Sequence, residues 1–440
     1  MRRAARAIAA ACAALAVACA VALPGAAVAA ERTPTPTPTE EPDPTRAAEY
    51  WLEAYGIEDA WDTARGQGVT IAVIDSGVAA DIDELDGAVA GGTDVSGVGA
   101  ADGRTPLGSD VHTRSHGTWV ASLAAARGTG EEEGMIGVAP EADLLAVSLG
   151  FGSVSDVPFS DQVADAMRWS VDNGADVINL SFTTNQTQWD ESWDDAFQYA
   201  YDNDVVVVVA AGNRVSGTTM VGAPATIPGV LTVAGVDPDG RASEDASTQG
   251  ITIGVSAPSE QLLGISPTGT VEQWSGTSGS APIVSGIVAL VRSAYPRLDA
   301  VNVINRIVQT ADPAPEQTGE RDPLYGFGIV DARAAIEDDV PLVSENPMGS
   351  LAEWVRINRA AGSEPEAAVT PTPDPVELPA LPAVDGPAEA GSPFLPSAES
   401  LRDVTLPLVA LSAAGILFVL GVVAVSRRIR SARAQRGPNP

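Results

Sequence analysis

The sequence predicts an α/β domain in which a mainly parallel β-sheet is covered by helices on both faces. Short apolar runs rich in valine and isoleucine alternate with segments whose apolar residues recur at helical spacing. In residues 162–182, Val163 and Met167 mark one face of a helix, and an extended apolar run follows it. Continuous apolar strands between amphipathic helices are typical of a parallel sheet that is buried on both sides.

The expected elements repeat this plan along the chain. In parallel α/β sheets the chemistry collects at the carboxyl ends of the strands, which here are Asp75, Ser181 and Asn213. Strands are expected at 69–75, 142–150, 176–182, 205–209, 230–236 and 251–258, and helices at 119–126, 162–174, 193–204, 281–295 and 299–311.

Charge and composition exclude one class of partner. The 440 residues are 45% hydrophobic and carry a formal net charge of −33. Eight of the 25 basic residues lie in 1–30 and 404–440, which contain no acid, so residues 31–403 carry 17 basic against 58 acidic residues. Such a surface repels phosphate backbones, and we expect no nucleic-acid binding. We interpret the acidic residues as a solvated exterior.

An apolar segment near the beginning of the chain predicts export. Residues 1–30 begin with arginines, continue with an apolar run and end with small residues, as a secretory signal peptide does, with cleavage expected after Ala29 or Ala30. Cys12 and Cys19, the only cysteines, lie within it, so we expect no disulfide in the mature chain. A lipoprotein cysteine at Cys19 is the alternative, but the apolar run continues past it.

A second apolar segment, residues 404–426, predicts a membrane anchor. It contains no charged residue, and as a helix it would be about 34 Å long, enough for a hydrocarbon core of roughly 30 Å. The arginine-rich tail 427–440 follows, and arginines beside a span stay in the cytoplasm. We therefore expect a single-pass protein of the cell membrane, with its C-terminus cytoplasmic and its acidic bulk outside.

Between these segments we expect one folded domain with extended flanks. Residues 31–48 are rich in proline and threonine and are expected to be disordered. Residues 346–403 are rich in proline and acid, as a linker or stalk is. Residues 49–345 have a globular composition and form the predicted domain.

Three residues at predicted element boundaries have the chemistry of an activated nucleophile. Asp75 ends a strand, His116 precedes an apolar helix, and Ser278 precedes another. A serine hydroxyl needs an imidazole to take its proton, and the imidazole needs a carboxylate to orient it and stabilise its cation. Free N–H groups at a helix start, with the side chain of Asn213, would hold a developing oxyanion. Each residue alone has an ordinary explanation as a cap or turn residue, so the combination carries the prediction.

The blocks around these residues resemble those of the subtilisin-like serine proteases, the subtilases. They are VTIAVIDSGV, HGTWVAS, VINLSF, VVVAAGN and GTSGSAP, and their order Asp, His, Ser is that of subtilisin. The resemblance covers about 50–335 and implies a subtilisin-like fold with a single catalytic domain.

The resemblance also implies roles for individual residues. Asp75 would orient the histidine, His116 would act as general base and acid, Ser278 would attack the peptide bond, and Asn213 would bind the oxyanion. A peptide or protein substrate would lie along six residues, and no cofactor would be needed, although structural calcium is common in the family and has no residues assigned here. The six substrate-binding residues are Ser181, Phe182, Thr183, Ala210, Ala211 and Gly212.

The chain departs from the family pattern in several places. Thr183 stands where glycine is common, and its β-branched side chain would crowd the cleft and affect specificity. Trp119 stands where a histidine is common, and Gly279 and Ser280 replace the usual Met-Ala after the nucleophile. Only about 20 residues follow the signal peptide, so we expect no folded pro-segment.

The order of segments resembles that of the mycosins, the membrane-anchored subtilases of actinobacterial type VII secretion, although mycosins usually have cysteines in the mature domain. This implies a serine endopeptidase that works through an acyl-enzyme at the outer membrane face, with a secretion machinery as partner. A generic membrane-anchored subtilase of actinobacterial type is the other interpretation of the same order of segments. The alternative is a catalytically inactive subtilase fold that serves as a surface scaffold or binding module.

The only two histidines, His112 and His116, are four residues apart, a spacing that binds zinc in His-Glu-x-x-His helices. No glutamate lies between them, and Arg114 does. We therefore assign chemistry to His116 alone. We expect Ser115 to begin the helix, which leaves His112 in the preceding loop.

Overall fold

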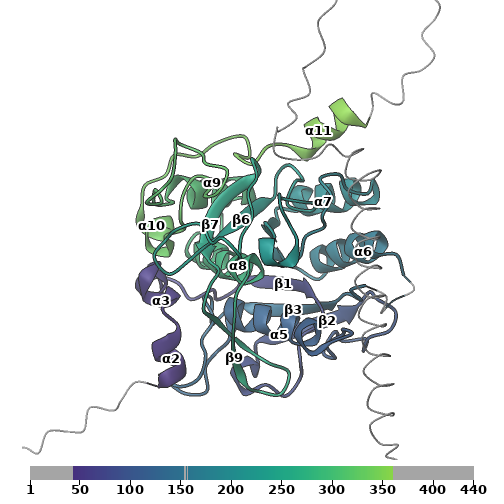
Figure 1. The fold of residues 1–440 in the computed structure, drawn as a ribbon, viewed down its shortest axis with the longest axis vertical. Coiled ribbons are helices and arrows are strands. Elements are labelled where there is room, and N and C mark those ends of the chain that lie inside the picture. The colour runs from purple at the N-terminus through teal and green to yellow at the C-terminus, as the bar shows by residue number, and fades with distance from the viewer. Residues whose placement is uncertain (1–42, 153–154, 156, 360–440) are drawn as a thin grey trace, which may run out of the picture. The chain divides into compact units, whose positions relative to one another are not determined.

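Seven parallel strands form the central sheet of the computed structural model, which describes residues 43–152, 155 and 157–359 (Figure 1). Their order across the sheet is β2-β3-β1-β4-β5-β6-β7, and every pair is parallel. The predicted fold class is confirmed. The strands are β1 (Thr70–Asp75), β2 (Val89–Asp94), β3 (Asp143–Ser148), β4 (Val177–Leu180), β5 (Val206–Ala210), β6 (Leu231–Val236) and β7 (Ile253–Pro258).

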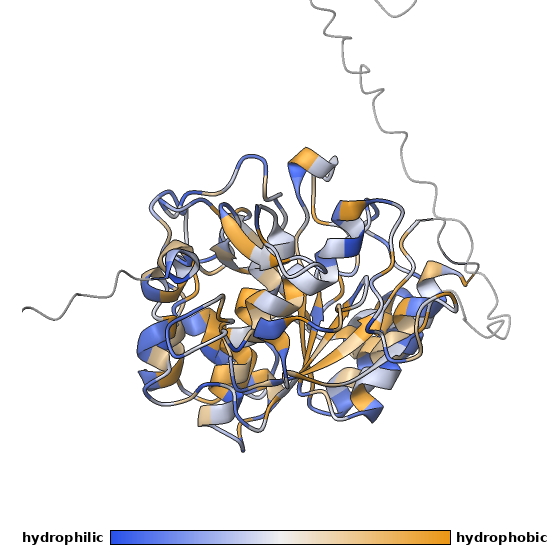
Figure 2. Ribbon diagram, turned by 90° about the horizontal axis from the view of Figure 1, so that it is seen from below, coloured by the Kyte–Doolittle hydropathy of each residue, from blue (hydrophilic) through white to orange (hydrophobic). Residues whose placement is uncertain are grey.

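The sheet separates two apolar cores, because successive side chains of a strand point to opposite faces. Ile71 and Val73 of β1 belong to one core, whereas Ala72 and Ile74 belong to the other. Figure 2 shows the apolar strands between the helical layers. The first core also holds side chains of α3 (Trp51–Ala54), α4 (Ile57–Ala60), α5 (Val111–Ala125), α8 (Thr277–Ala294), α9 (Ala300–Gln309) and α10 (Ala332–Glu337), and the second those of α6 (Phe159–Asp172), α7 (Ser192–Asp202) and α11 (Leu351–Asn358).

Several short elements were not expected from the sequence. The strand β2 contains adjacent glycines and is only partly buried, so its sequence lacks the apolar run that marked the other strands. An antiparallel hairpin packs against α5 beside the sheet. The remaining short elements are β8 (Leu262–Ile265), β9 (Val271–Trp274), α2 (Pro44–Ala48), η1 (Asp83–Leu85) and η2 (Arg214–Ser216).

Regular structure extends past both predicted borders of the domain at 49 and 345. At the first border, Asp43 caps α2 and Arg46 donates to the carbonyl of Gly134 at 3.0 Å, which attaches this segment to the body. At the second, the Trp354 ring of α11 packs against Trp189 with centroids 4.3 Å apart. These distant contacts give the flanking residues partners that their local sequence does not reveal.

The predicted signal peptide, the anchor 404–426 and the tail 427–440 lie outside the described residues, as does most of the predicted linker. Among the helices within residues 43–359, none has the length and apolarity needed to cross a membrane.

Candidate active site

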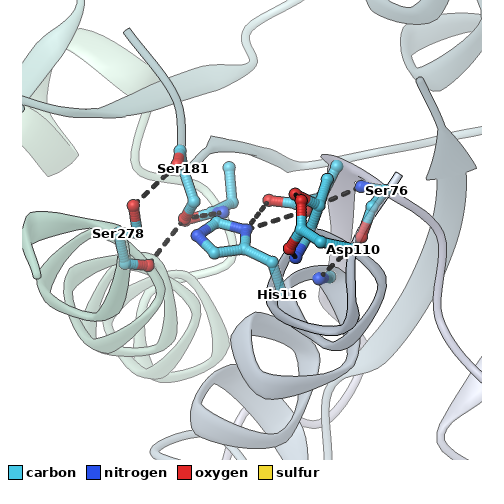
Figure 3. A network of polar contacts seen from close by, with 9 residues as sticks. Ser76, Asp110, His116, Ser181 and Ser278 are labelled. Atoms are coloured by element: carbon cyan, nitrogen blue, oxygen red, sulfur yellow. Dashed lines mark hydrogen bonds and ion pairs between the residues drawn. The ribbon is translucent and has the colours of Figure 1, made fainter. Parts of the chain in front are cut away.

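The carboxyl end of β1 carries a buried carboxylate that contacts an imidazole. Asp75 is fully buried, and its Oδ1 accepts a hydrogen bond from the backbone N–H of Ser76 at 2.7 Å. Both carboxylate oxygens lie 2.9 Å from Nδ1 of His116, in the second turn of α5 (Figure 3). This contact fixes the proton on Nδ1 and leaves Nε2 as the basic nitrogen.

A glycine lets α5 approach the end of β1 closely enough for this contact. A Cβ atom on Gly117 would lie 2.3 Å from the carbonyl oxygen of Gly77, a distance that no side chain permits. The backbone N–H of Gly117 instead donates to Oγ of Ser76 at 3.0 Å. The Gly after the histidine therefore follows from the packing of the helix on the strand.

The surroundings of His116 favour its protonated form. Its side chain is 17% exposed, and burial alone would lower the pKa of the imidazole. The charge of Asp75 and the hydrogen bond to it outweigh burial and raise this pKa above its ordinary value of 6.5. The imidazole can therefore hold a proton taken from a nearby hydroxyl.

The helix that carries His116 begins earlier than expected. Asp110 is its N-cap and accepts from the backbone N–H of Thr113 at 3.0 Å, so the helix starts at Val111 rather than at Ser115. His112 therefore lies in the first turn and not in a loop, because the aspartate three residues before Thr113 satisfies the free N–H groups.

His112 also lines the cleft, packed edge-on against the Trp119 ring with centroids 5.0 Å apart. Its ring centroid lies 6.2 Å from that of His116. Burial, followed by the charge of His116, lowers the pKa of His112 below its ordinary value. Within the described residues, no group of three or more His, Cys, Asp or Glu side chains is placed to hold a metal ion.

Ser278 lies one residue inside α8, whose first residue is Thr277. Its hydroxyl donates to the carbonyl of Ser181, just past β4, at 2.9 Å (Figure 3). In the described part of the chain no hydrogen bond joins Ser278 to His116, although both line one cleft. Catalytic hydrogen bonds are often long until substrate binds, so this geometry is compatible with a nucleophile and its base.

Asn213 follows β5, and its amide is held in one orientation. Oδ1 accepts from the backbone N–H of Thr277 at 2.8 Å and from the Thr277 hydroxyl at 3.0 Å. The Thr277 hydroxyl in turn accepts from the backbone N–H of Gly212 at 2.9 Å. With Oδ1 occupied, Nδ2 is the donor that remains for a ligand in the cleft, which Asn213 lines beside Ser278. The role of Thr277 was not predicted, although it belongs to the quoted GTSGSAP block.

The six residues that are expected to bind substrate divide into two groups. The cleft has a volume of about 330 Å³, and five of the six line it; the exception is Ala211, whose side chain is fully buried in the second core because it points to the opposite face. The five are Ser181, Phe182, Thr183, Ala210 and Gly212. Sequence reasoning missed several other lining residues, among them Phe151, Asn185 and Thr218, which come from loops without a distinctive pattern.

One part of the cleft is narrowed by two threonines. A Cβ atom on Gly212 would lie 2.8 Å from the Thr183 methyl and 2.7 Å from the Thr218 methyl. The Thr183 hydroxyl donates to the carbonyl of Gly222 at 3.1 Å, which fixes the side chain. The Thr183 methyl therefore lies against Gly212, in a part of the cleft that carries no charged side chain.

With this geometry in view, comparison with known proteins identifies the family. The model of the subtilase family, peptidase family S8, matches residues 66–328. This is more than half of the chain, which therefore belongs to the subtilase family and is a subtilisin-like serine protease.

The relatives include a mycosin and a thermitase. Mycosin-4 of Mycobacterium tuberculosis is 34% identical over 334 residues, which cover 66% of this chain and 70% of that protein. Thermitase of Thermoactinomyces vulgaris is 35% identical over 264 residues, which cover 60% of this chain and 88% of thermitase. Among solved structures, the MycP3 protease from the type VII (ESX-3) secretion system aligns with a TM-score of 0.56 at 30% identity, over 66% of this chain and 88% of that one.

Proposed function

We propose that this subtilase is an exported, membrane-anchored endopeptidase that uses Asp75, His116 and Ser278 as its catalytic triad. His116 Nε2 takes the proton of the Ser278 hydroxyl as the hydroxyl attacks the peptide carbonyl, and the leaving amine then receives that proton. The resulting acyl-enzyme is hydrolysed by water through the same base. Asp75 keeps the imidazole oriented and stabilises its cation.

The single observation that carries this proposal is the contact between Asp75 and His116. Both oxygens of a fully buried carboxylate lie 2.9 Å from Nδ1, and the ring reaches the cleft that Ser278 lines. A merely structural histidine would not need a buried charge aimed at one ring nitrogen. This arrangement supports the triad more strongly than the order of the sequence blocks alone.

Asn213 is the proposed oxyanion donor. Its Oδ1 is occupied by two donors of Thr277, so Nδ2 is left to donate to the negative charge that develops on the substrate carbonyl. In subtilisin, removal of the corresponding donor costs about 10²–10³ in kcat, and we expect the same order for Asn213→Ala.

The proposed substrate is an extended peptide segment. It would lie along Ser181, Phe182 and Thr183, with Ala210 and Gly212 on one wall of the pocket for the side chain that precedes the cleaved bond. No cofactor takes part in the proposed chemistry. Structural calcium remains a proposal without assigned ligands.

Export and anchoring rest on the sequence of residues 1–30 and 404–426. The likeness to mycosin-4, and to a protease from a type VII secretion system, supports a role beside such a machinery at the outer face of the cell membrane. We test this by fractionating cells that express the full chain and a variant truncated after residue 403. The full chain should stay in the membrane fraction and the variant should not; retention of both would exclude the anchor.

The triad is tested by labelling the detergent-solubilised full chain with a fluorophosphonate, which reacts with activated serines. We expect labelling of the wild type and none of Ser278→Ala. An unlabelled wild type with a normal cooperative unfolding transition would instead favour the inactive scaffold. Labelling of Ser278→Ala would mean that another serine is the nucleophile.

A further inference from the structure

The main chain of the proposed nucleophile lacks one helical hydrogen bond. In an α-helix the carbonyl of one residue accepts from the N–H four residues later. Four residues after Ser278 in α8 stands Pro282, which has no N–H and whose ring crowds the carbonyl of Ser278. The carbonyl of Ser278 therefore needs a donor from outside the helix.

The side chain of Ser181 supplies that donor. Its Oγ donates to the carbonyl oxygen of Ser278 at 2.8 Å, while the Ser278 hydroxyl donates to the carbonyl of Ser181 at 2.9 Å. Ser181 is 1% exposed. The two serines thus form reciprocal hydrogen bonds between the end of β4 and the start of α8 (Figure 3).

Two further buried side chains fix the direction of the Ser181 hydroxyl. Asn179 donates from Nδ2 to Oγ of Ser181 at 2.9 Å, and Ser285 donates from Oγ to Oδ1 of Asn179 at 3.0 Å. Asn179 and Ser285 are both fully buried. Because Ser285 occupies the amide oxygen, the amide nitrogen must face Ser181, which then accepts from Asn179 and gives its own hydrogen to the carbonyl of Ser278.

We propose that Ser285, Asn179 and the Ser181 side chain are positioning residues that hold Ser278 in its reactive place. This series of hydrogen bonds starts at Ser285 and ends at Ser278, and these two residues are seven positions apart in α8. The series therefore joins the helix to the end of β4 at two points. Removal of the Ser285 hydroxyl frees the Asn179 amide to turn, after which Ser181 can donate to Asn179 instead of to Ser278. A nucleophile displaced by about 1 Å can lose 10²-fold in rate. The inference rests on the proposed function, since it concerns the placement of the catalytic serine.

The test uses the full chain with Ser181→Ala, Ser285→Ala and the double variant, assayed for kcat and KM with one peptide substrate. We expect kcat to fall about 30-fold in Ser181→Ala and about fivefold in Ser285→Ala, because each hydrogen bond contributes modestly but acts on the reacting atom. KM should change less than twofold. The double variant should lose no more than Ser181→Ala, because both changes remove the same hydrogen from the carbonyl of Ser278.

Ser280→Ala is the matched control. Ser280 is fully buried on the same helix, nearer to Ser278 than Ser285 is, and its hydroxyl donates to the carbonyl of Pro258 at 2.8 Å. Its loss should lower the unfolding temperature as much as the loss of the Ser285 hydroxyl does, with kcat within twofold of the wild type.

Three outcomes overturn the inference: no fall of kcat in Ser285→Ala, an equal fall in Ser280→Ala and Ser285→Ala, or losses that multiply in the double variant. Failure of the proposed function would look different, because then neither the wild type nor the variants would react with the fluorophosphonate. A wild type that reacts and turns over, beside an unchanged Ser285→Ala, would reject the positioning role alone.

Discussion

Asp75 and Glu49 are both buried carboxylates, but their surroundings differ. Asp75 is fully buried and meets Nδ1 of His116 with both oxygens at 2.9 Å. Glu49 is 3% exposed and accepts from the backbone N–H of Ile136 at 3.1 and 3.3 Å, with Arg46 Nε 3.5 Å away. Asp75 thus holds the imidazole of His116 in place. Glu49 attaches the N-terminal segment to the body of the domain.

Burial shifts the pKa of Glu49 and the pKa of His116 in opposite directions. At Glu49, burial raises the pKa to about 8, because the lost hydration outweighs the N–H of Ile136 and the charge of Arg46. At His116, burial disfavours the charged ring, but the charge of Asp75 and the hydrogen bond to it together outweigh burial and raise the pKa of the imidazole. Burial therefore favours a proton on the carboxyl of Glu49. At the other site, the carboxylate of Asp75 favours a proton on the imidazole of His116.

The largest expected effect separates the two histidines. His116→Ala removes the proposed base and should lower kcat by about 10⁶, the order found for this change in subtilisin. His112→Ala, in the same helix and the same cleft, should stay within tenfold of the wild type, because His112 contacts Trp119 and not the carboxylate. Steady-state kinetics of both variants makes the comparison. An equal loss from both would reopen the interpretation of the pair as a metal site.

The next effect compares the two carboxylates directly through isosteric amides. Asp75→Asn should lower kcat by about 10⁴, because an amide stabilises the wrong tautomer of the imidazole and cannot balance its cation. Glu49→Gln should leave kcat within twofold, because Glu49 contacts Ile136 and not the cleft. Both variants are measured at pH 8 with the same peptide. A comparable loss of turnover in Glu49→Gln would mean that the N-terminal segment takes part in catalysis.

A smaller effect is expected on the acid side of the pH profile. The general base must be neutral, and the pKa of His116 lies above its ordinary value of 6.5, so kcat/KM should fall as pH decreases through a midpoint above 6.5. Below that midpoint the fall should be about tenfold per pH unit. The residual activity of Asp75→Asn should show a lower midpoint, because the charge that raises the pKa is gone. A wild-type midpoint at or below 6.5 would contradict the role of Asp75.

The sheet and the blocks around the candidate site could be predicted from the sequence. The contacts that hold the site residues in place could not. Asp75 ends a continuous apolar strand, and His116 and Ser278 stand in short, ordered blocks, so local pattern was sufficient there. The hydrogen bond between Ser285 and Asn179 joins residues 106 positions apart, and nothing local to either residue indicates it. The start of α5 was misplaced because the cap at Asp110 was not recognised.

The helices α2 and α11, which lie beyond the predicted domain borders at 49 and 345, were not expected for a similar reason. Arg359 donates to Asp194 at 2.7 Å, across 165 positions, and Trp354 packs against Trp189 beside it. A short helix is marginal alone, and tertiary contacts stabilise it. The composition of residues 346–359 therefore does not reveal the helix that they contain.

Glu49 yields the last prediction, a change in stability with little change in turnover. The folded protein keeps this proton up to about pH 8, whereas the unfolded chain releases it near 4.5, so stability should fall as pH rises through that window. Glu49→Gln cannot lose a proton, and its amide oxygen can still accept from Ile136. Urea unfolding at pH 5, 7 and 9 should show the wild type losing about 4 kcal/mol relative to Glu49→Gln across the series. The exposed Glu53, changed to Gln, is the matched control and should follow the wild type. A difference between wild type and Glu49→Gln that does not vary with pH would show that Glu49 stays charged, and that burial does not separate the two carboxylates.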